Sequence, residues 1–553
     1  MPSVDTASAI LSSLDALGVT HVLYCPGSRS APFAYALEAG SFGGDARAVL
    51  DERGAGFAAV GLARTGALPA IVVTSGTAVA ELAPAVLEAS HARLPLLLLT
   101  ADRPGELRGV GASQATDQSG LFGGHVRASV DLEPQEPSRA LVGQLTRAVA
   151  AACGAPAGAP GPVQINVAFR DPLTPVRPAC DCGDEGVVPF APRPTRVLRA
   201  HAEPECWEDV VGDARAGLIV VGEGASPRAR EWSRAAGFPL LAEPASGAWK
   251  GGGVTPFEQS LVASSLGSEV DTVVVTGRPT LSRPIQALLA RPDVRVVVVD
   301  PHSPWVDLSG NASVVVADLE PAREPISAAQ AEWSARVRDA ARDAGERIDS
   351  LLASGSGRTM LDLARAVASS TSGPLVLGAS NPVRAFDLGV SSLEGRVVHS
   401  NRGQAGIDGT IATAVGIALG SGCAGEASAP TGERVTAVMG DLTACHDASS
   451  LALAASVGAY LDIVVADDQG GGIFATLEHG RAASPEAYDR WFGVAQSVDY
   501  EALAAAYGVA FARAETPAQL AQLLEIGEVG PRLVHTPVER AAHLYPALRD
   551  VLS

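Results

Sequence analysis

A chain of 553 residues, 47% of them hydrophobic, is long enough for several cores, and we expect about three domains. A formal net charge of −20 argues against nucleic acid as a partner, and no apolar run approaches the ~20 residues of a membrane-spanning helix. Lys250 is the only lysine, so nearly all positive charge belongs to arginine, whose planar fork suits carboxylates and phosphates.

The first residues and the cysteines bear on the compartment. The opening stretch contains Asp5 and Asp15 and no basic segment, so we expect no secretory signal peptide. Seven cysteines include one close pair, Cys180 and Cys182, without a second pair that could complete a zinc site. These features predict reduced thiols and a cytoplasmic protein.

Short β-branched runs alternate with alanine-rich helical stretches, which is the pattern of parallel α/β sheets. In the first third we predict strands at residues 21–25, 47–51, 70–74, 95–100 and 162–169. A Pro- and Arg-rich linker is expected at 191–205. In the middle third we predict strands at residues 218–223, 239–243, 272–277, 294–300 and 313–318, followed by a charged helix at 328–352.

The last third continues the same alternation. Its predicted strands are residues 374–380, 396–400, 434–441, 461–468, 509–514 and 532–538. Length and pattern together predict an α/β protein of three successive doubly wound domains with mainly parallel sheets. The expected domains are residues 1–180, 195–330 and 355–553.

Two acidic clusters close neighbouring strands in the last third. The strand at 434–441 ends at Asp441, one crossover helix is expected at 442–460, and the next strand ends at Asp468. Parallel strands have their carboxyl ends at one sheet edge, so the two carboxylates should lie side by side and repel each other unless a cation such as Mg²⁺ lies between them. The glycines at 470–472 would let the backbone approach phosphate, and a helix is expected to begin there. The alternative is a pair of solvated aspartates that cap helices.

The spacing of these acids resembles the signature of thiamin diphosphate-dependent enzymes, since 27 positions separate them (468 − 441 = 27) and a glycine turn follows. The resemblance implies that Asp441, Asp468 and the carbonyl of Gly470 bind Mg²⁺ or Mn²⁺, with Gly440 in the cofactor site. This chain has Asp468 where the family usually has asparagine, and GDL where it usually has GDG. The additional carboxylate is expected to tighten binding of the divalent cation.

A glutamate that faces N1′ of the aminopyrimidine is the second element of that signature. Glu52 follows a predicted strand and precedes a helix of small residues, so the resemblance implies that it is catalytic and contacts the cofactor. A glutamate in this place also fits an ordinary helix-start acid, which the helix dipole favours. The metal motif in the same chain favours the catalytic role.

Five further motifs narrow the resemblance: CPGSRSAP (25–32), TSGTAVAEL (74–82), LTADRP (99–104), GASNPVR (378–384) and SNRGQAGIDGT (400–410). Together they resemble one family among the thiamin diphosphate-dependent enzymes, the 2-succinyl-5-enolpyruvyl-6-hydroxy-3-cyclohexene-1-carboxylate synthases of menaquinone biosynthesis. The similarity covers nearly the whole chain. It is weakest in the middle third, which matches mainly at TGRPT (276–280).

The resemblance implies a transferase that decarboxylates 2-oxoglutarate and adds the succinyl carbanion equivalent to isochorismate in 1,4 fashion, with release of CO₂. It also implies a homodimer or homotetramer with active sites between chains. Both substrates are dianions, which suits bidentate arginines, although a surface salt bridge is the alternative for any one of them. The implied substrate-binding residues are Ser28, Arg29, Arg103, Gln114, Arg278, Arg384 and Arg402, with apolar contacts from Ile473, Phe474 and Leu477.

Three more residues complete the implied site. The resemblance places Ile407 under the thiazolium and Ser380 near the aminopyrimidine. His446 is a candidate acid or base, but a lone histidine in a helix is more often structural.

Two alternatives for the whole chain stay open. One is another thiamin diphosphate-dependent enzyme, such as an acetohydroxyacid synthase with FAD in the middle domain. The only hint of a dinucleotide site there, GEGAS at 222–226, is too weak alone. The other alternative is a non-catalytic nucleotide-binding module, which would have no need for Glu52.

Overall fold

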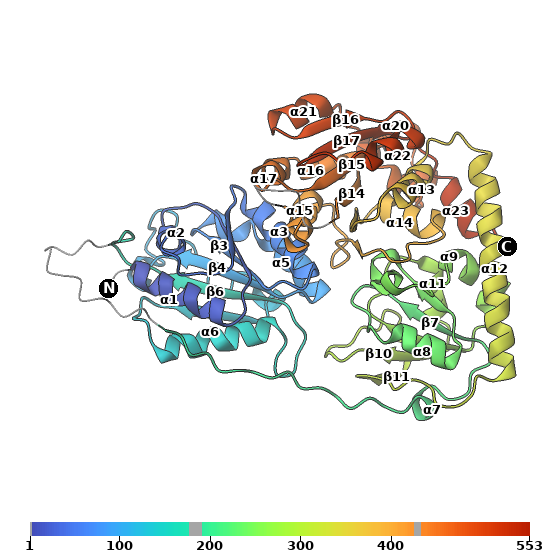
Figure 1. Ribbon diagram of the computed structural model, residues 1–553, viewed down its shortest axis with the longest axis horizontal. Coiled ribbons are helices and arrows are strands. Elements are labelled where there is room, and N and C mark those ends of the chain that lie inside the picture. The colour runs from blue at the N-terminus through green and yellow to red at the C-terminus, as the bar shows by residue number, and fades with distance from the viewer. Residues whose placement is uncertain (1–2, 176–190, 425–432) are drawn as a thin grey trace, which may run out of the picture. The chain divides into compact units, whose positions relative to one another are not determined.

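The computed structural model describes residues 3–175, 191–424 and 433–553 (Figure 1). It contains sheets of six, five and six strands, and the named strands pair in parallel throughout. The predicted α/β class with mainly parallel sheets is therefore confirmed. By internal contacts the chain divides into two compact units, the first being Met1–Ala200, Ile411–Gly422 and Ser449–Ser456, and the second the remainder. The middle and last sheets both belong to the second unit, and the three domain ranges stay a prediction.

The first unit is built on a six-stranded sheet whose strand order is β2-β1-β3-β4-β6-β5. Its strands are β1 (His21–Tyr24), β2 (Asp45–Ala48), β3 (Pro69–Val73), β4 (Leu96–Asp102), β5 (Ala128–Leu132) and β6 (Pro162–Ala168). The central strands β3, β4 and β6 are buried along their whole length, as expected where helices cover both faces. Helices α1 (Ser3–Ala16) and α6 (Arg139–Ala152) share a core with one face, and α3 (Glu52–Arg64) and α5 (Ala83–Ala92) pack against the sheet as well.

Strand β5 was not predicted from the sequence. It lies at the sheet edge, pairs only with β6, and alternates half-buried and exposed residues in the segment ASVDL. Because an edge strand of this kind needs no continuous apolar run, its sequence gives little strand signal. The edge strand β2 also begins two residues before the predicted range of 47–51.

The middle sheet confirms all five strands predicted for the central third. They are β7 (Gly217–Val221), β8 (Leu240–Ala242), β9 (Thr272–Thr276), β10 (Arg295–Val299) and β11 (Ala312–Val316), in the order β11-β10-β9-β7-β8. The charged helix predicted at 328–352 is α12 (Ala328–Ala353), which Ser327 caps through a bond from the Gln330 amide. Trp333 and Val337 of α12 lie in the core that covers this sheet.

The last sheet repeats the strand order of the first, position for position. Its strands are β12 (Leu375–Leu377), β13 (Val398–His399), β14 (Val435–Gly440), β15 (Leu461–Asp467), β16 (Ala510–Arg513) and β17 (Arg532–Pro537), in the order β13-β12-β14-β15-β17-β16. In each six-stranded sheet the chain reverses direction after the first two strands. Ligands of open α/β sheets bind at such switch points, beyond the carboxyl ends of the strands. The topology therefore marks β1/β3 and β12/β14 as the two places to look for a site.

The crossover between β14 and β15 corrects one prediction. Instead of a single helix over 442–460, the chain forms α16 (Asp441–His446) and α17 (Ser450–Ser456). The break falls at Asp447 and the serines beyond it, whose side chains compete with helical hydrogen bonds. The helix expected after the glycine turn is also short, because α18 (Gly472–Ala475) has only four residues. Such a helix has little macrodipole to offer a phosphate.

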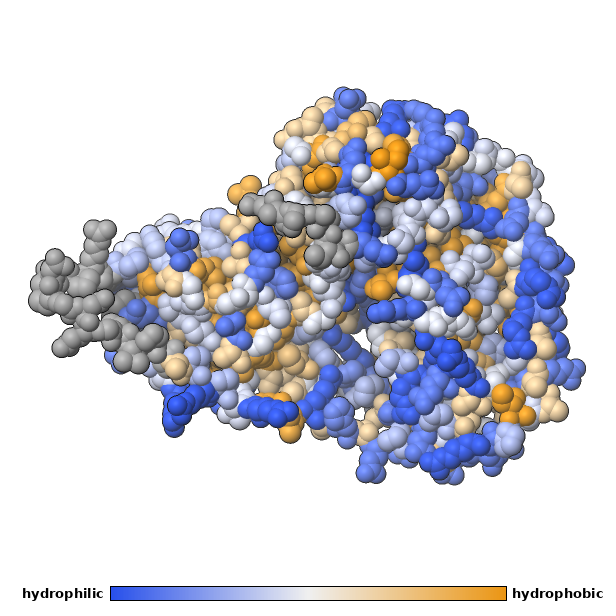
Figure 2. Space-filling view, viewed as in Figure 1, coloured by the Kyte–Doolittle hydropathy of each residue, from blue (hydrophilic) through white to orange (hydrophobic). Residues whose placement is uncertain are grey.

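Several expectations about the whole chain can be compared with the described residues. Among these residues, no helix is long and apolar enough to cross a membrane. The described cysteines Cys25, Cys153, Cys206, Cys423 and Cys445 are all free thiols, whereas Cys180 and Cys182 lie outside the described ranges. On the face shown in Figure 2, hydrophilic residues cover much of the surface and hydrophobic ones form small scattered patches.

Within the first unit, α3 and α15 (Thr410–Gly420) approach so closely that glycine is required at the contact. A Cβ on Gly416 would lie 1.9 Å from the carbonyl oxygen of Ala58, and one on Gly61 would lie 2.1 Å from that of Thr413. Both obstacles are backbone atoms, which cannot rotate away. The helix that begins at Glu52 is thus held against α15 by backbone contact.

We predict that Gly416→Ala lowers the free energy of unfolding by about 2–4 kcal/mol, because the added methyl group forces the two helix backbones apart. Denaturant titration followed by circular dichroism measures the change. Gly124→Ala is the matched control, since a Cβ there would meet no atom within 4 Å. If the two variants have the same free energy of unfolding, the contact between α3 and α15 accommodates the added methyl group without a loss of stability.

Candidate active site

Two carboxylates lie at the carboxyl ends of the adjacent strands β14 and β15. The parallel register pairs Gly440 with Ala466, so Asp441 and Asp468 each follow closely at the same sheet edge. Asp441 is only 3% exposed, and its carboxylate accepts hydrogen bonds from the amides of Leu442 (2.8 Å) and Gly470 (2.7 Å). The structure therefore brings the three predicted metal ligands to one place.

The electrostatics of this pair favour a cation. Burial, with the nearby charge of Asp467, raises the pKa of Asp441 to about 6. Burial, with the charge of Asp441, raises the pKa of Asp468 to about 7. Near neutral pH Asp468 thus tends to hold a proton in the protein alone, whereas Asp441 does so only in mildly acidic solution. A bound divalent ion would stabilise the ionised forms of both carboxyls. Hard oxygen donors of this kind fit Mg²⁺ or Mn²⁺, with diphosphate and water oxygens free to complete the coordination.

Glycine is required in the turn that follows Asp468. Gly470 has φ +122°, and a Cβ there would lie 2.1 Å from the carbonyl oxygen of Gly493. A Cβ on Gly472 would lie 1.9 Å from a carboxylate oxygen of Asp468. The turn therefore keeps the backbone close to the acids, as the glycine-rich sequence predicts.

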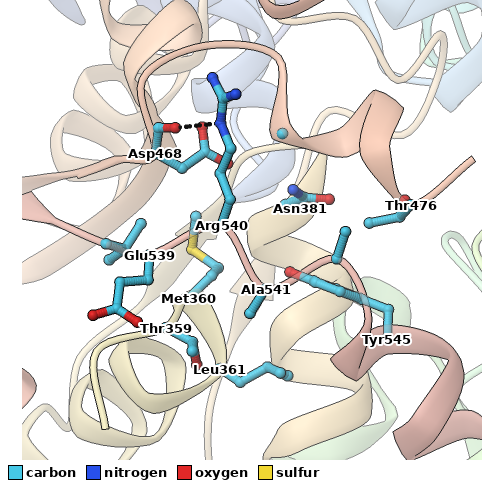
Figure 3. A pocket seen from close by; sticks show the side chains of 13 residues that line it. Thr359, Met360, Leu361, Asn381, Asp468, Thr476, Glu539, Arg540, Ala541 and Tyr545 are labelled. Carbon is cyan, nitrogen blue, oxygen red and sulfur yellow. Dashed lines mark hydrogen bonds between the residues drawn. The ribbon is translucent and has the colours of Figure 1, made fainter. Parts of the chain in front are cut away.

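Three further ionisable residues lie around these acids and were not predicted from the sequence. Asp467, the last residue of β15, shares a hydrogen bond with Asp441 and accepts one from Nε2 of His535 (2.9 Å), which is the main reason that its pKa is lowered. Arg540 donates from Nε to the backbone oxygen of Asp468 at 2.7 Å (Figure 3). Asp467 is visible in the sequence as half of an acidic pair, but His535 and Arg540 reach the site only through the position of β17 beside β15.

A small cavity adjoins the predicted metal ligand Asp468 (Figure 3). Its volume is about 20 Å³, and its walls include Asp468, Asn381 and Tyr545. Oδ1 of Asn381 and the hydroxyl of Tyr545 are buried and have no hydrogen-bond partner among the described residues. A space of this size holds about one water molecule, which would satisfy both atoms.

Three predicted substrate arginines converge in the second unit. Arg384, on α14 (Asn381–Gly389), and Arg402 both donate to the carbonyl of Ala379, at 3.1 and 3.3 Å. Arg278 donates to the carbonyl of Arg402 at 2.9 Å and forms an ion pair with Glu223 at 2.9 Å. Nε of Arg402 is buried without a hydrogen-bond partner in the described ranges, so it remains available to an anionic ligand.

The remaining predicted residues of the second unit have local roles that the structure defines. Ser380 is the residue before α14, and its carbonyl accepts from Arg384 at 2.7 Å. Ile407 is half-buried in the turn before α15. The half-buried side chains Ile473, Phe474 and Leu477 follow the glycine turn, and the ring of Phe474 lies 5.7 Å from that of Phe492. His446 lies 3.8 Å from Asp408 and is partly exposed.

In the first unit, Glu52 is the first residue of α3. Asp51 caps this helix by accepting from the amides of Arg53 (2.9 Å) and Gly54 (3.2 Å), and the Ser449 hydroxyl holds the other oxygen of Asp51 (2.8 Å). Glu52 itself lines an open pocket of about 520 Å³. The walls of this pocket are otherwise formed by Asp51, Arg53, Thr74, Thr77, Ala78, Glu81 and Gln114.

The other predicted residues of the first unit follow β1 and β4. Arg103 donates to the Ser75 hydroxyl at 2.6 Å and to the Gln114 carbonyl, while Nε2 of Gln114 donates to the Ser75 carbonyl at 2.9 Å. Arg29 donates to the Phe169 carbonyl at 2.9 Å, and burial, together with the nearby charge of Arg103, lowers its pKa. Ser28 is exposed beside Arg29. The predicted residues thus form one group in each unit, beyond the carboxyl ends of strands of the six-stranded sheets and, for Arg278, of the middle sheet.

Comparisons with known proteins give matches to two family domains and to relatives that span nearly the whole chain. Residues 4–121 match the family described as thiamine pyrophosphate enzyme, N-terminal TPP binding domain, and residues 387–536 match thiamine pyrophosphate enzyme, C-terminal TPP binding domain. A protein of Kineococcus radiotolerans named 2-succinyl-5-enolpyruvyl-6-hydroxy-3-cyclohexene-1-carboxylate synthase is 42% identical, over 98% of this chain and 96% of its own. Proteins of the same name from a Nocardioides species and from Renibacterium salmoninarum are 39% and 38% identical, over at least 97% of this chain and 95% of theirs.

We predict that Asp468→Asn stabilises the metal-free protein at pH 8 while it weakens binding of Mg²⁺ or Mn²⁺. Since the folded-state pKa of Asp468 is raised from 3.8 to about 7, its contribution to stability is fully present below about pH 4 and is lost as the pH rises through 7. Asparagine does not ionise, so this loss is absent in the variant, and we expect its free energy of unfolding to be ~1–3 kcal/mol higher at pH 8. Urea denaturation at pH 5 and pH 8, and calorimetric titration with Mn²⁺ and thiamin diphosphate, measure the two effects.

The control for this prediction is Asp339→Asn, which removes an exposed carboxylate on α12 and should leave both quantities within error. A variant Asp468→Asn that is no more stable at pH 8 and binds Mn²⁺ as tightly as the unaltered protein would remove Asp468 from the metal site.

Proposed function

Since the chain belongs to the family of 2-succinyl-5-enolpyruvyl-6-hydroxy-3-cyclohexene-1-carboxylate synthases, which are thiamin diphosphate-dependent enzymes, we propose that it joins 2-oxoglutarate to isochorismate with loss of CO₂. The observation that carries this proposal is that two strand-end acids and three converging arginines lie in one unit. The names of the relatives favour this reaction over that of an acetohydroxyacid synthase and over a non-catalytic module.

Thiamin diphosphate supplies an electron sink for the decarboxylation and the carbon–carbon bond formation. Asp441, Asp468 and the carbonyl of Gly470 would hold Mg²⁺ or Mn²⁺, and through it the diphosphate. Gly440 would lie beside the diphosphate, with Ile407 and Ser380 against the cofactor rings.

Glu52 would hold the proton that N1′ of the aminopyrimidine shares. It is the first residue of a helix that Asp51 caps, and the Ser449 hydroxyl donates to Asp51. These bonds fix the backbone at Glu52, whose side chain lines an open pocket. A fixed position is what proton transfer requires of an acid or base.

The arginines would bind and orient the substrate carboxylates. Arg278, Arg384 and Arg402 belong to one hydrogen-bonded cluster. Arg103 and Gln114 form the second, and Arg29, with Ser28 beside it, lies near enough for the charge of Arg103 to act on it. Two clusters suit a reaction that combines two dianions, because each substrate needs its own counter-charges. Ile473, Phe474 and Leu477 would exclude water from the ring of isochorismate.

We further infer a cytoplasmic homodimer or homotetramer in which each cofactor contacts two chains, with domains at residues 1–180, 195–330 and 355–553. Glu52 belongs to one compact unit and the metal ligands to the other, and one cofactor has to reach both groups. The two six-stranded sheets have the same strand order, and each carries one of the two groups beyond the carboxyl ends of its strands, which supports the same arrangement.

The direct test of the proposed reaction is product analysis. Purified protein with thiamin diphosphate, Mg²⁺, isochorismate and 2-oxoglutarate labelled at C1 should release labelled CO₂ and form a product whose mass corresponds to the two substrates less CO₂. Labelled CO₂ without the coupled product would indicate a decarboxylase that uses another acceptor. Absence of both from the cofactor-loaded protein would contradict the proposal.

Arg402→Ala and Arg384→Ala should impair substrate use far more than cofactor binding. Loss of a charge-assisted fork to a buried carboxylate costs ~2–4 kcal/mol, which corresponds to a fall in kcat/KM of about 30- to 1,000-fold. Steady-state kinetics and a thiamin diphosphate titration measure the two quantities. Arg342→Ala, at an exposed pair with Asp339 on α12 (3.1 Å), is the control and should change neither. Unaltered kinetics in both variants would make these arginines purely structural.

A shared site predicts complementation between inactive variants. Glu52→Gln should lose roughly 10²–10⁴ in rate through the missing proton carrier, and Asp441→Ala should be inactive through the missing metal ligand. In a mixed dimer one site would combine intact Glu52 with intact Asp441, so co-expressed chains should recover part of the activity. If isolated heterodimers show no recovery, each site lies within a single chain.

A further inference from the structure

Three buried carboxyl groups surround the arginines of the second unit and have no part in the proposed reaction. Glu243 follows β8 directly, Glu258 begins α9 (Glu258–Ala263), and Asp387 lies on α14 three residues after Arg384. Their exposed fractions are 3%, 2% and 8%. Three acids buried so deeply are stable only if neighbouring positive charges compensate them or if they remain protonated.

Hydrogen bonds satisfy these carboxyls only in part. Glu243 accepts from the amide of Leu281 at 2.5 Å, and Gln259 donates to Asp387. Neither carboxyl oxygen of Glu258 has a hydrogen-bond partner in the part of the chain that the structure describes. An ionised carboxylate in such surroundings costs several kcal/mol, so the group retains a proton instead.

The acids differ in how strongly their surroundings favour protonation. Burial raises the pKa of Glu243 to about 8, and burial together with the charges of Asp387 and Glu243 raises that of Glu258 well above its ordinary value. Burial raises the pKa of Asp387 only to about 6, because the Gln259 bond and the charges of Arg384 and Arg402 oppose it. At pH 7 Glu243 and Glu258 are therefore neutral, and Asp387 is the one ionised member.

The backbone before Glu258 shows that its position is imposed by the fold. Phe257 is buried and has φ 62° and ψ 42°, in the left-handed region that bulky residues rarely occupy. Such a conformation costs of order 1–3 kcal/mol and persists only where surrounding contacts enforce it. Phe257 packs in the same core as Leu281, Val383 and Phe386, next to the arginine cluster. This packing holds Glu258 inside instead of letting it turn to solvent.

We propose that Glu243 and Glu258 are positioning residues which, as neutral acids, support the elements around Arg384 and Arg402 without neutralising these arginines. Glu243 binds the amide of Leu281, next to Thr280, whose hydroxyl accepts from Arg402 at 2.9 Å. Glu258 precedes Gln259, which donates to Asp387 on the helix of Arg384. The inference rests on the proposed function, because it concerns how these arginines bind a dicarboxylate. Ionised acids at these positions would form buried ion pairs with the arginines and compete with the substrate. Neutral acids supply volume and hydrogen-bonding capacity but no counter-charge.

The net charge around Arg384 and Arg402 shows how the protonation of Glu243 affects substrate binding. Arg384 and Arg402 contribute two positive charges and Asp387 one negative charge, while Arg278 and Glu223 cancel each other. Arg283, whose charge also acts on Arg384, is paired with Glu478 at 3.9 Å, so this pair adds no net charge. One positive charge is left for the substrate at neutral pH. When Glu243 ionises in the alkaline range, that surplus disappears. The charged and titratable groups that act on Glu243 are Arg402, Asp387, Glu223 and Glu258.

The pH dependence of KM tests this proposal. For the holoenzyme, KM for 2-oxoglutarate or for isochorismate should rise about three- to tenfold between pH 7 and pH 9, with a smaller change in kcat, because the surplus charge is lost. Glutamine mimics a protonated glutamate, so Glu243→Gln should have a KM within about twofold of the parent value at pH 7 and no alkaline rise. Asp300→Asn alters another buried acid, which accepts from the amides of His302 (3.1 Å) and Val306 (3.0 Å), and should keep the parent profile.

A binding measurement keeps the proposal testable if Glu243→Gln does not fold. Glutarate, a dicarboxylate that cannot react, should bind the unaltered holoenzyme more weakly at pH 9 than at pH 7 by the same factor, and Glu258→Gln should bind it normally at pH 7. An alkaline rise in KM that persists in Glu243→Gln, or glutarate affinity that does not depend on pH, would overturn the proposal. Failure of the proposed function would look different, because the unaltered enzyme would then form no coupled product at any pH.

Discussion

Repulsion between two carboxylates at neighbouring strand ends is the constraint on which the rest of the site depends. Asp441 and Asp468 are placed at one edge by the parallel register of β14 and β15, and burial raises the pKa of both. Among the described residues, the amides of Leu442 and Gly470 and the side chain of Arg540, which is bonded to the Asp468 backbone, relieve this arrangement in part. Protonation of the acids relieves it further. A divalent cation neutralises the repelling carboxylates, and its positive charge then favours binding of a diphosphate at this sheet edge.

The charges of the arginines, like those of the paired aspartates, are only partly neutralised by neighbouring groups. Arg384 and Arg402 donate to backbone carbonyls and hydroxyls, while the acids nearest to them are buried and mostly protonated. A site whose charges were already paired would gain little from a charged ligand. The fold instead leaves the negative charge of Asp441 and Asp468 to be neutralised by a cation, and the positive charge of Arg384 and Arg402 to be neutralised by substrate carboxylates. Metal, cofactor and substrate would therefore each bind a different part of the site.

The sequence predicted the strands of the middle and last sheets well, because buried parallel strands are continuous apolar runs. It failed where the structure departs from that rule, at the half-exposed edge strand β5 and at the helix break near Asp447. The metal acids could be located because a glycine turn and a fixed interval accompany them. His535 and Arg540 could not, because only the pairing of β17 with β15 brings them to Asp467 and Asp468. The acids Glu243, Glu258 and Asp387 carry no motif, and only their burial distinguishes them.

Calorimetric titration of the protein with thiamin diphosphate, with Mg²⁺ present or with chelator, tests the account most directly. We predict that binding requires Mg²⁺, and that at pH 6.5 it releases protons because Asp441 and Asp468 must ionise to hold the metal. The proton release, read from the buffer dependence of the enthalpy, should fall towards that of the cofactor itself at pH 8.5. Equally tight binding in chelator, or proton release that is the same in Asp468→Asn, would contradict the account.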